Sequence, residues 1–332
     1  MVTILRGSCS DLLWRGHDTR NDLLYLMLNL PFRCNYQCLV CCNLNDAAEP
    51  RLSKKRLDIG WVKDLLAEAR NVGIQVVVLA GEGEPFLDPD WKKLLDEIIG
   101  HGLLPYIFTN GSQLGRSNAQ RLARYRASLI ISVPSLDPAQ YRLLTGGRGD
   151  VNRLRENIEA CREEFSGLVE VHGDQRVVSL AINTVLNRAN RDQIEPIRRL
   201  CGNDIVHVCN LPTRIGMAEH HWAQLFAGAS DGLVDGALYE LLMRQQPLGT
   251  TPDGQTCAYM MNGVSVSADG RLLTCAYALG SAGMYPQLRL GDLAEANRQV
   301  RTSLEEFFAI HGHGRCILRH PDYGQFIKGE CK

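Results

Sequence analysis

Residues 28–42 read LNLPFRCNYQCLVCC, and they carry the strongest structural signal in the sequence. An apolar run over residues 23–32 leads into it and predicts a first β-strand. Cys34, Cys38 and Cys41 follow in the loop after that strand, where an α/β barrel carries its chemistry. Three thiolates can hold three irons of a cubane and leave the fourth iron open to a small molecule. Structural zinc, in contrast, takes four protein ligands.

The spacing of three residues and then two between these cysteines resembles the motif of the radical S-adenosylmethionine (radical SAM) superfamily. The resemblance implies that the open iron of a [4Fe–4S] cluster binds the amino and carboxylate groups of S-adenosylmethionine (AdoMet). One electron then cleaves AdoMet into methionine and a 5′-deoxyadenosyl radical. A zinc loop is the alternative. Val40 stands where the family often has an aromatic residue, and of the adjacent thiols we expect Cys41 rather than Cys42 to be the ligand.

The composition excludes several other classes of protein. The chain has 332 residues and a formal net charge of −1, with basic residues scattered, so nucleic acid is not an expected partner. No apolar run is long enough to cross a bilayer, and charged residues interrupt the N-terminus where a signal peptide would be apolar. We therefore expect a cytoplasmic protein without a membrane partner. Its twelve cysteines are then metal ligands, catalytic thiols or small buried residues rather than disulfides.

A second motif follows the next predicted strand. Apolar residues at helical spacing over residues 59–72 precede a buried strand at residues 76–80. That strand ends in GEGEP, residues 81–85, which resembles the Gly-Gly-Glu-Pro segment of the superfamily. The resemblance implies that Gly83, Glu84 and Pro85 bind the amino group of AdoMet.

Alternating patterns continue along the chain. Further strands are predicted at residues 105–108, 129–133, 177–185 and 205–209, and further helices at residues 90–100, 151–165 and 191–200, with another opening at residues 135–138. Six βα units between about residues 25 and 220 suit the partial (β/α)6 barrel of the superfamily. The resemblance also implies that polar residues at the strand ends lie near AdoMet: Thr109, Asn110, Ser132 and Asn183.

The C-terminal part carries a second group of cysteines. Two short apolar runs joined by Asp269-Gly270 predict a β-hairpin, with Cys257 before it and Cys275 after it. This arrangement resembles the SPASM or shorter Twitch extension of radical SAM enzymes, and the number of cysteines favours one auxiliary [4Fe–4S] cluster. The implied ligands are Cys257, Cys275, Cys316 and Cys331. A zinc site on the same thiols is the alternative, and a nearby histidine is a possible replacement for one ligand: His311, His313 or His320.

These features predict an α/β chain with a small α+β C-terminal domain. The expected parts are an N-terminal extension (1–24), the barrel (25–220), a helical linker or lid (221–250) and the auxiliary-cluster domain (251–332).

The first functional hypothesis rests on a resemblance to aminocyclitol dehydrogenases and epimerases. It is the oxidation of a secondary alcohol of a sugar or aminocyclitol to a ketone in antibiotic biosynthesis, with flavodoxin or ferredoxin as reductant.

An epimerase is the first alternative, with Cys209 as hydrogen-atom donor, and a decarboxylase is a variant of it. A peptide-modifying maturase is the second alternative, although only about twenty-five residues precede the first strand. A non-enzymatic iron–sulfur role fits least, because the three-cysteine site leaves an open iron. Glu82, His207 and Arg214 are further candidates for substrate contact or proton transfer.

Overall fold

The computed structural model describes residues 1–30, 33–42, 56–226, 257–278, 281, 284–312, 316–320 and 322–328. The chain forms two compact units. The first consists of Met1–Ser8, Cys34–Ala48 and Phe108–Leu248, and the second of Cys9–Arg33, Glu49–Ile107 and Gly249–Lys332. Among the described residues, no helix combines the length and the apolar character that a membrane crossing requires.

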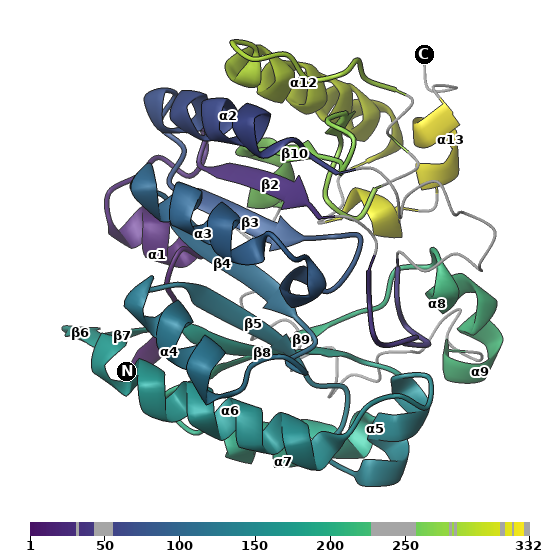
Figure 1. Ribbon diagram of the computed structural model, residues 1–332. Coiled ribbons are helices and arrows are strands. Elements are labelled where there is room, and N and C mark those ends of the chain that lie inside the picture. The colour runs from purple at the N-terminus through teal and green to yellow at the C-terminus, as the bar shows by residue number, and fades with distance from the viewer. Residues whose placement is uncertain are drawn as a thin grey trace. The chain divides into compact units, whose positions relative to one another are not determined.

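The second unit is built on mostly parallel strands in the order β11-β10-β2-β3-β4, of which Figure 1 labels β10, β2, β3 and β4. The strands are β2 (Tyr25–Asn29), β3 (Val76–Ala80), β4 (Leu104–Thr109, whose last two residues fall in the first unit), β10 (Gly263–Val266) and β11 (Leu272–Leu273). β10 pairs in parallel with β2, and only β11 runs antiparallel to its neighbour. Every residue of β2 and β3 is buried, as expected for parallel strands covered on both faces.

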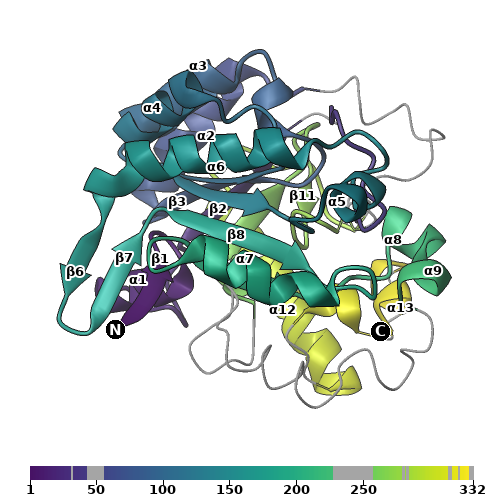
Figure 2. The ribbon, with the colours of Figure 1, turned by 90° about the horizontal axis from the view of Figure 1, so that it is seen from below.

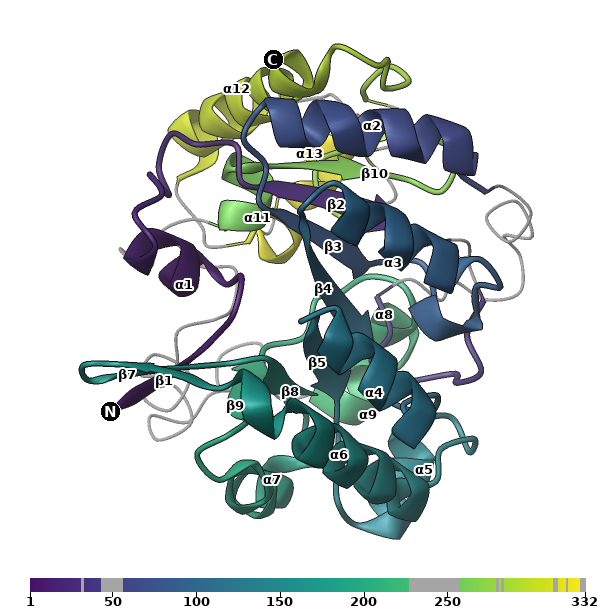
Figure 3. The ribbon, with the colours of Figure 1, turned by 60° about the vertical axis from the view of Figure 1, so that its left-hand side comes forward.

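The second unit also contains helices. They are α1 (Cys9–Trp14), α2 (Ile59–Asn71), α3 (Trp91–Gly100), α11 (Ala258–Met261), α12 (Leu293–His311) and α13 (Tyr323–Lys328), with 3-10 turns η2 (Pro85–Leu87) and η6 (Ile317–Arg319). The Asp58 carboxylate caps α2 by accepting a hydrogen bond from the backbone N–H of Trp61 at 2.9 Å. α2 packs against α3, and α12 lies against α11 and β10 (Figure 3).

The first unit carries two sheets. The parallel strands β5 (Ser128–Ser132), β8 (Leu180–Val185) and β9 (Val206–Asn210) form one, and β1 (Val2–Leu5), β7 (Gln175–Val178) and β6 (Glu170–His172) form the other. The helices are α4 (Arg116–Arg124), α5 (Pro138–Leu144), α6 (Val151–Phe165), α7 (Ile194–Cys201), α8 (Met217–His220) and α9 (Trp222–Phe226), with 3-10 turns η3 (Ser166–Leu168) and η4 (Arg191–Gln193). α6 packs against α4 (Figure 2), and α7 packs against β9.

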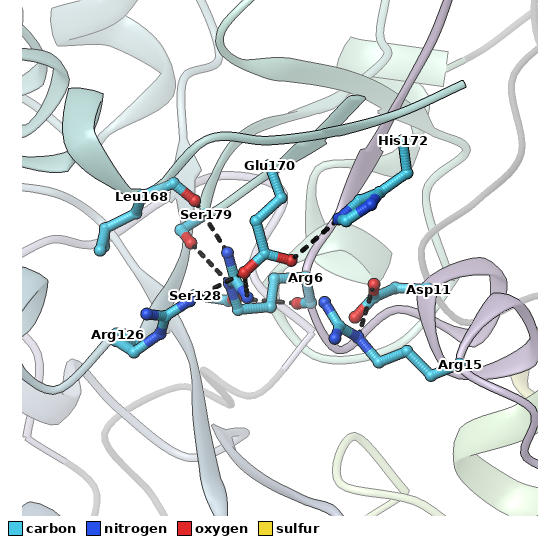
Figure 4. A network of polar contacts seen from close by, with 9 residues as sticks. All are labelled: Arg6, Asp11, Arg15, Arg126, Ser128, Leu168, Glu170, His172 and Ser179. Carbon is cyan, nitrogen blue, oxygen red and sulfur yellow. Dashed lines mark hydrogen bonds and ion pairs between the residues drawn. The ribbon is translucent and has the colours of Figure 1, made fainter. Parts of the chain in front are cut away.

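The single strand predicted at residues 177–185 is wrong, because the chain changes sheet at Ser179. Residues before it pair with β1, and residues after it pair with β5 and β9. The buried Arg6 guanidinium fixes this change by donating to Ser179 Oγ at 3.2 Å, Glu170 Oε1 at 2.9 Å and the Leu168 carbonyl at 2.8 Å (Figure 4). The predicted N-terminal extension therefore contributes a strand, β1, that the sequence did not reveal.

The other strand predictions and the C-terminal hairpin are confirmed. The division into parts differs from the predicted domains, because the pairing of β10 with β2 places the hairpin in the same compact unit as the first predicted strand. Most of the predicted linker or lid, residues 227–250, lies outside the described residues. Its described part consists of His221 and the short helix α9. The closure of the six strands into a partial barrel stays a prediction.

Candidate functional site

The cysteine loop, residues 33–42, begins a few residues after the carboxyl end of β2. Cys34, Cys38 and Cys41 are all half-buried in it. The backbone N–H of Cys41 donates to the carbonyl of Cys38 at 3.1 Å, so the last two of these thiols sit on one turn. The loop thus presents three thiols that are neither sequestered in the core nor fully exposed.

Two N–H groups are directed at the Cys34 sulfur. The backbone N–H of Tyr36 lies 3.5 Å from Sγ, and the Asn110 side-chain amide lies 3.8 Å from it. Asn110 also donates to Asn35 Oδ1 at 2.9 Å and accepts from the backbone N–H of Ser112 at 2.9 Å, so its orientation is fixed. Hydrogen-bond donors favour the charged form of a thiol, and they suit a thiolate that binds iron.

The segment at the end of α5 holds one side of the cysteine loop. Gln37 N–H donates to the Thr145 carbonyl at 3.3 Å, and Leu39 N–H donates to the Leu144 carbonyl at 3.0 Å. Gly146 has φ +67°, and a Cβ atom there would lie 2.3 Å from the Gln37 carbonyl oxygen. This close approach requires glycine.

The segment after β9 holds the other side. Ala218 N–H donates to the Cys41 carbonyl at 3.3 Å. Gly216 has φ +59°, and an added Cβ would lie 2.4 Å from the Cys42 carbonyl oxygen and 2.9 Å from that of Cys41. Cys42, the extra thiol in the sequence, therefore takes part in this contact through its backbone carbonyl. We call the close approach of Gly216 to the carbonyls of Cys41 and Cys42 the Gly216 brace.

Apolar side chains complete the packing around the loop. Leu39 and Val40 contact a small cluster of residues from the same unit: Leu144, Ala189, Trp222 and Leu225. The Arg214 guanidinium lies over the Trp222 ring, 5.7 Å from its centroid. Val40, which replaces the aromatic residue often seen in the family, is thus a packing residue of the loop.

The donor set of the cysteine loop fits the iron cluster inferred from the sequence. Three thiols and two N–H donors to sulfur are the kind of groups that hold and tune such a cluster. In the part of the chain that the structure describes, no three histidine, cysteine or acidic side chains converge closely enough for a single metal ion. A cubane does not require that convergence, because each thiolate binds a different iron.

Polar residues at the strand ends of the first unit fall on two faces. Thr109 is buried and accepts the Gly111 N–H at 3.0 Å, so it shapes the turn. Ser132 is paired with Asn183 in the β5–β8 register, and Asn210 donates to Asn183 Oδ1 at 2.5 Å. Because side chains alternate along a strand, Ser132, Asn183 and Asn210 share one face of the sheet.

Cys209 lies on the opposite face, with Thr184 and His207. The Thr184 hydroxyl donates to the Val133 carbonyl at 2.9 Å and lies 3.1 Å from His207 Nε2, and Cys209 Sγ lies 3.6 Å from the same nitrogen. Burial lowers the pKa of His207 to about 4, with Arg198 adding to the shift. The proposed hydrogen-atom donor of the epimerase hypothesis is therefore directed away from Asn183 and Asn210.

The GEGEP segment lies in the second unit. Glu84 is buried, its backbone N–H donates to the Arg33 carbonyl at 2.7 Å, and its carboxylate accepts the Phe86 N–H at 3.4 Å at the start of η2. Gly83 precedes it and is only partly buried. The backbone of Glu84 is thus tied to Arg33 of the same unit.

Two residues of the same unit hold the C-terminal hairpin against β2 and β3. The amide of Asn29, with its nitrogen turned toward them, donates to the carbonyls of Ala80 at 2.8 Å and Ala276 at 3.2 Å. Gly81 has φ +102°, and a Cβ atom there would overlap the Asn29 side chain and lie 3.0 Å from the Ala276 oxygen. Asn29 was not among the predicted site residues. An amide side chain in an otherwise apolar predicted strand is the feature of the sequence that could have indicated its role.

Three of the four predicted auxiliary ligands are described. Cys275 is buried just after β11, Cys257 precedes α11 and Cys316 precedes η6. Burial raises the pKa of Cys257 to about 12, and the nearby Cys316 adds to the shift, so these two thiols are neighbours. Cys331 lies outside the described residues. A four-thiol auxiliary site therefore stays a prediction.

The two described histidines near Cys316, His311 and His320, have protein partners. His311 Nδ1 lies 3.0 Å from Asp322 Oδ2, and His320 Nδ1 accepts the Asp322 N–H at 3.2 Å. His311 also stacks on Phe307 with ring centroids 4.6 Å apart. His313 lies outside the described residues.

Comparison with known proteins gives consistent results. A profile of the radical SAM superfamily matches residues 28–201, just over half of the chain. The chain is 26% identical over 322 residues to a GTP 3′,8-cyclase of Synechococcus sp. (strain CC9902), covering 85% of this chain and 87% of the relative.

Solved structures show the same fold at low identity. The structure of anSMEcpe with bound AdoMet and Cp18Cys peptide matches with a TM-score of 0.54 at 13% identity, over 84% of this chain and 83% of that one. SuiB of Streptococcus suis bound to its precursor peptide SuiA matches with a TM-score of 0.54 at 18% identity, over 82% of this chain. The chain spans 63% of the length of that SuiB chain.

Proposed function

The chain belongs to the radical SAM superfamily, and from this premise we propose that it removes a hydrogen atom from a secondary alcohol carbon of a sugar or cyclitol. Its cofactors are AdoMet and a [4Fe–4S] cluster. When bound, the cluster supplies the electron that cleaves AdoMet into methionine and the 5′-deoxyadenosyl radical. The observation that carries the proposal is the cysteine loop inside the matched region, with three half-buried thiols and N–H donors directed at Cys34.

We assign the cluster to Cys34, Cys38 and Cys41. The two glycines that hold this loop, Gly146 and Gly216, leave room for the carbonyls of Gln37, Cys41 and Cys42, so they set the path of the backbone that carries the thiols.

The proposed AdoMet contacts come from two sets of residues. Gly83, Glu84 and Pro85 offer carbonyl and carboxylate acceptors, which suit an ammonium group. Thr109, Asn110, Ser132 and Asn183 offer hydroxyl and amide groups, which suit ribose hydroxyls and a carboxylate.

The substrate class follows from what two reactions have in common. The name GTP 3′,8-cyclase specifies the 3′ position of a ribose, which is a secondary alcohol carbon, and that relative aligns over most of this chain. Aminocyclitol dehydrogenases, the group that the sequence motifs suggested, react at the same kind of carbon, and we extend the proposal to them. We favour oxidation of the alcohol to a ketone, with the C-terminal cysteines holding an auxiliary [4Fe–4S] cluster that takes up one electron.

Deuterium transfer tests this proposal directly. The enzyme, reconstituted anaerobically, is given AdoMet, a reductant and one labelled compound: an aminocyclitol deuterated at its alcohol carbons, GTP deuterated at C3′, or a peptide deuterated at its α-carbons. We expect deuterium in 5′-deoxyadenosine from an alcohol-carbon label, together with a ketone product. Deuterium only from the peptide would contradict the proposal in favour of a maturase. A cyclised or inverted product without a ketone would support hydrogen abstraction at the alcohol carbon but contradict the oxidation to a ketone.

A further inference from the structure

A buried carboxyl group with one unused oxygen lies at the carboxyl end of β3. The Glu82 side chain belongs to a residue only 1% exposed. Its Oε1 accepts the backbone N–H of Ala268 at 3.3 Å, in the turn of the C-terminal hairpin. Its Oε2 has no hydrogen-bond partner among the described residues. A buried polar atom without a partner costs about 1–3 kcal/mol, so its retention calls for an explanation.

The position of this carboxyl group is closely fixed. Gly81, immediately before it, has no room for a side chain between Asn29 and the Ala276 carbonyl. The hydrogen bond to Ala268 then fixes the side chain from the other end. Carboxyl ends of parallel strands are also where α/β enzymes place their reactive groups. The free oxygen of Glu82 is therefore held in one place rather than being a mobile surface group.

The charge state of Glu82 is set mainly by its burial. Burial raises the pKa of Glu82 from an ordinary value of 4.5 to about 7, the Ala268 N–H opposes the shift, and the negative charge of Asp269 adds to it. Asp269 itself accepts the Ser267 hydroxyl at 2.5 Å and pairs with Arg271 at 3.3 Å. A group that titrates near the working pH is suited to general acid–base catalysis.

We propose that Glu82 is the acid–base residue of the reaction, and that its free oxygen accepts the hydroxyl proton of the substrate carbon that loses a hydrogen atom. This inference rests on the proposed oxidation of an alcohol.

The proposed step balances. The carbon first gives its hydrogen atom to the 5′-deoxyadenosyl radical, which becomes 5′-deoxyadenosine. The O–H bond of the remaining carbon radical then breaks, and its proton goes to the Glu82 carboxylate. The resulting radical anion gives one electron to a one-electron acceptor of the iron–sulfur class, and the C=O bond forms. The substrate thus loses two electrons and two protons in all.

The Glu82→Gln variant separates this role from a structural one. Glutamine keeps an oxygen that accepts the Ala268 N–H, but it takes up no proton. We expect deuterium transfer from the alcohol carbon to 5′-deoxyadenosine to continue, while ketone formation falls by about 10²- to 10⁴-fold. Glu156→Gln, at an exposed position on α6, is the matched control and should behave as wild type.

The pH profile supplies a second readout. Ketone formation by the wild-type enzyme should rise through about pH 7 as Glu82 loses its proton, and this rise should be absent in Glu82→Gln. Asp269→Asn removes a negative neighbour, so the rise should move to lower pH.

The possible outcomes distinguish the two proposals. Wild-type ketone formation by Glu82→Gln, or an unchanged pH rise in that variant, would overturn the role of Glu82 alone. Loss of iron content and of resistance to urea in Glu82→Gln would also overturn it, in favour of a structural role in holding the hairpin. Absence of deuterium transfer in the wild-type enzyme itself would overturn the proposed function and this inference with it.

Discussion

The cysteine loop and the C-terminal hairpin both carry cysteines, but they place them by different means. In the loop, three thiols lie within eight residues, and the backbone around them is held by the Gly216 brace and by the end of α5. In the C-terminal part, Cys257, Cys275 and Cys316 come from separate elements, and Cys257 and Cys275 flank the hairpin whose strand β10 pairs with β2. The first arrangement is therefore local in sequence, whereas the second exists only once the sheet has formed.

The two regions also differ in their buried ionisable groups. His207, in the unit of the cysteine loop, is kept neutral down to about pH 4. Glu82, beside the hairpin, changes charge at about pH 7. Each has one side-chain atom without a hydrogen-bond partner among the described residues, namely Nδ1 and Oε2. Of these two groups, only Glu82 can exchange a proton near neutral pH.

The largest expected effect separates the two groups of cysteines. Replacing Cys34, Cys38 and Cys41 together by alanine should reduce AdoMet cleavage to the background level, because these are the thiols to which we assign the cluster that supplies the electron. Replacing Cys257 and Cys275 should leave AdoMet cleavage in place and abolish ketone formation. Methionine and 5′-deoxyadenosine, measured by liquid chromatography after anaerobic reaction, report the first step. Equal loss of AdoMet cleavage in both variants would contradict the assignment of separate roles to the cysteine loop and the C-terminal cysteines.

The next effect concerns stability as a function of pH. Glu82 has a raised pKa in the folded state, so it lowers stability as pH rises from about 4.5 to about 7. His207 has a lowered pKa, so it lowers stability as pH falls from about 6.5 to about 4. Each contribution amounts to about 3 kcal/mol, and the two oppose each other where their ranges overlap.

Single variants should expose these opposing contributions. Relative to wild type, Glu82→Gln should gain stability toward pH 7, and His207→Gln should gain stability toward pH 4. Urea unfolding of the reconstituted protein across this pH range measures both, with Glu156→Gln as control. If the curves of stability against pH run parallel for wild type and both variants, the pKa values of Glu82 and His207 are not shifted as described.

The smallest effect tests the Gly216 brace. Gly216→Ala should destabilise the protein by about 2 kcal/mol more than Gly173→Ala, through the crowding of the Cys41 and Cys42 carbonyls. The two glycines form a matched pair, since Gly173 has φ +60° but no atom within 4 Å of an added Cβ. The same change should alter the EPR spectrum of the cluster, because it displaces the loop. Equal destabilisation and an unchanged spectrum in both variants would show that the brace does not position the loop.

Much of the parallel framework could be predicted from the sequence. Uninterrupted runs such as residues 76–80 are read directly as buried strands, and the Asp269-Gly270 turn marks the hairpin. The helix at Leu293–His311 was missed although its buried residues recur at helical spacing: Leu293, Ala296, Val300, Leu304 and Phe307. That signal was present in the sequence.

Other features depend on contacts between distant residues. The change of sheet at Ser179 requires Arg6, about 170 residues away, and nothing local marks it. The contacts of Gly146 and Gly216 with the cysteine loop join segments over 100 residues apart. The side of the sheet on which Cys209 lies follows from the register of β9, which a one-residue shift would reverse. Motif spacing therefore identified the chemistry, while the supports around it required the structure.

Iron and sulfide quantitation, combined with EPR under anaerobic conditions, tests the central claim most directly. The samples are the wild-type protein and the Cys34/Cys38/Cys41→Ala variant. Two [4Fe–4S] clusters predict about eight irons per chain in wild type and about four in the variant, with an EPR signal remaining in the variant. About four irons in wild type, falling to almost none in the variant while zinc is present, would contradict the auxiliary cluster and the oxidation proposed from it.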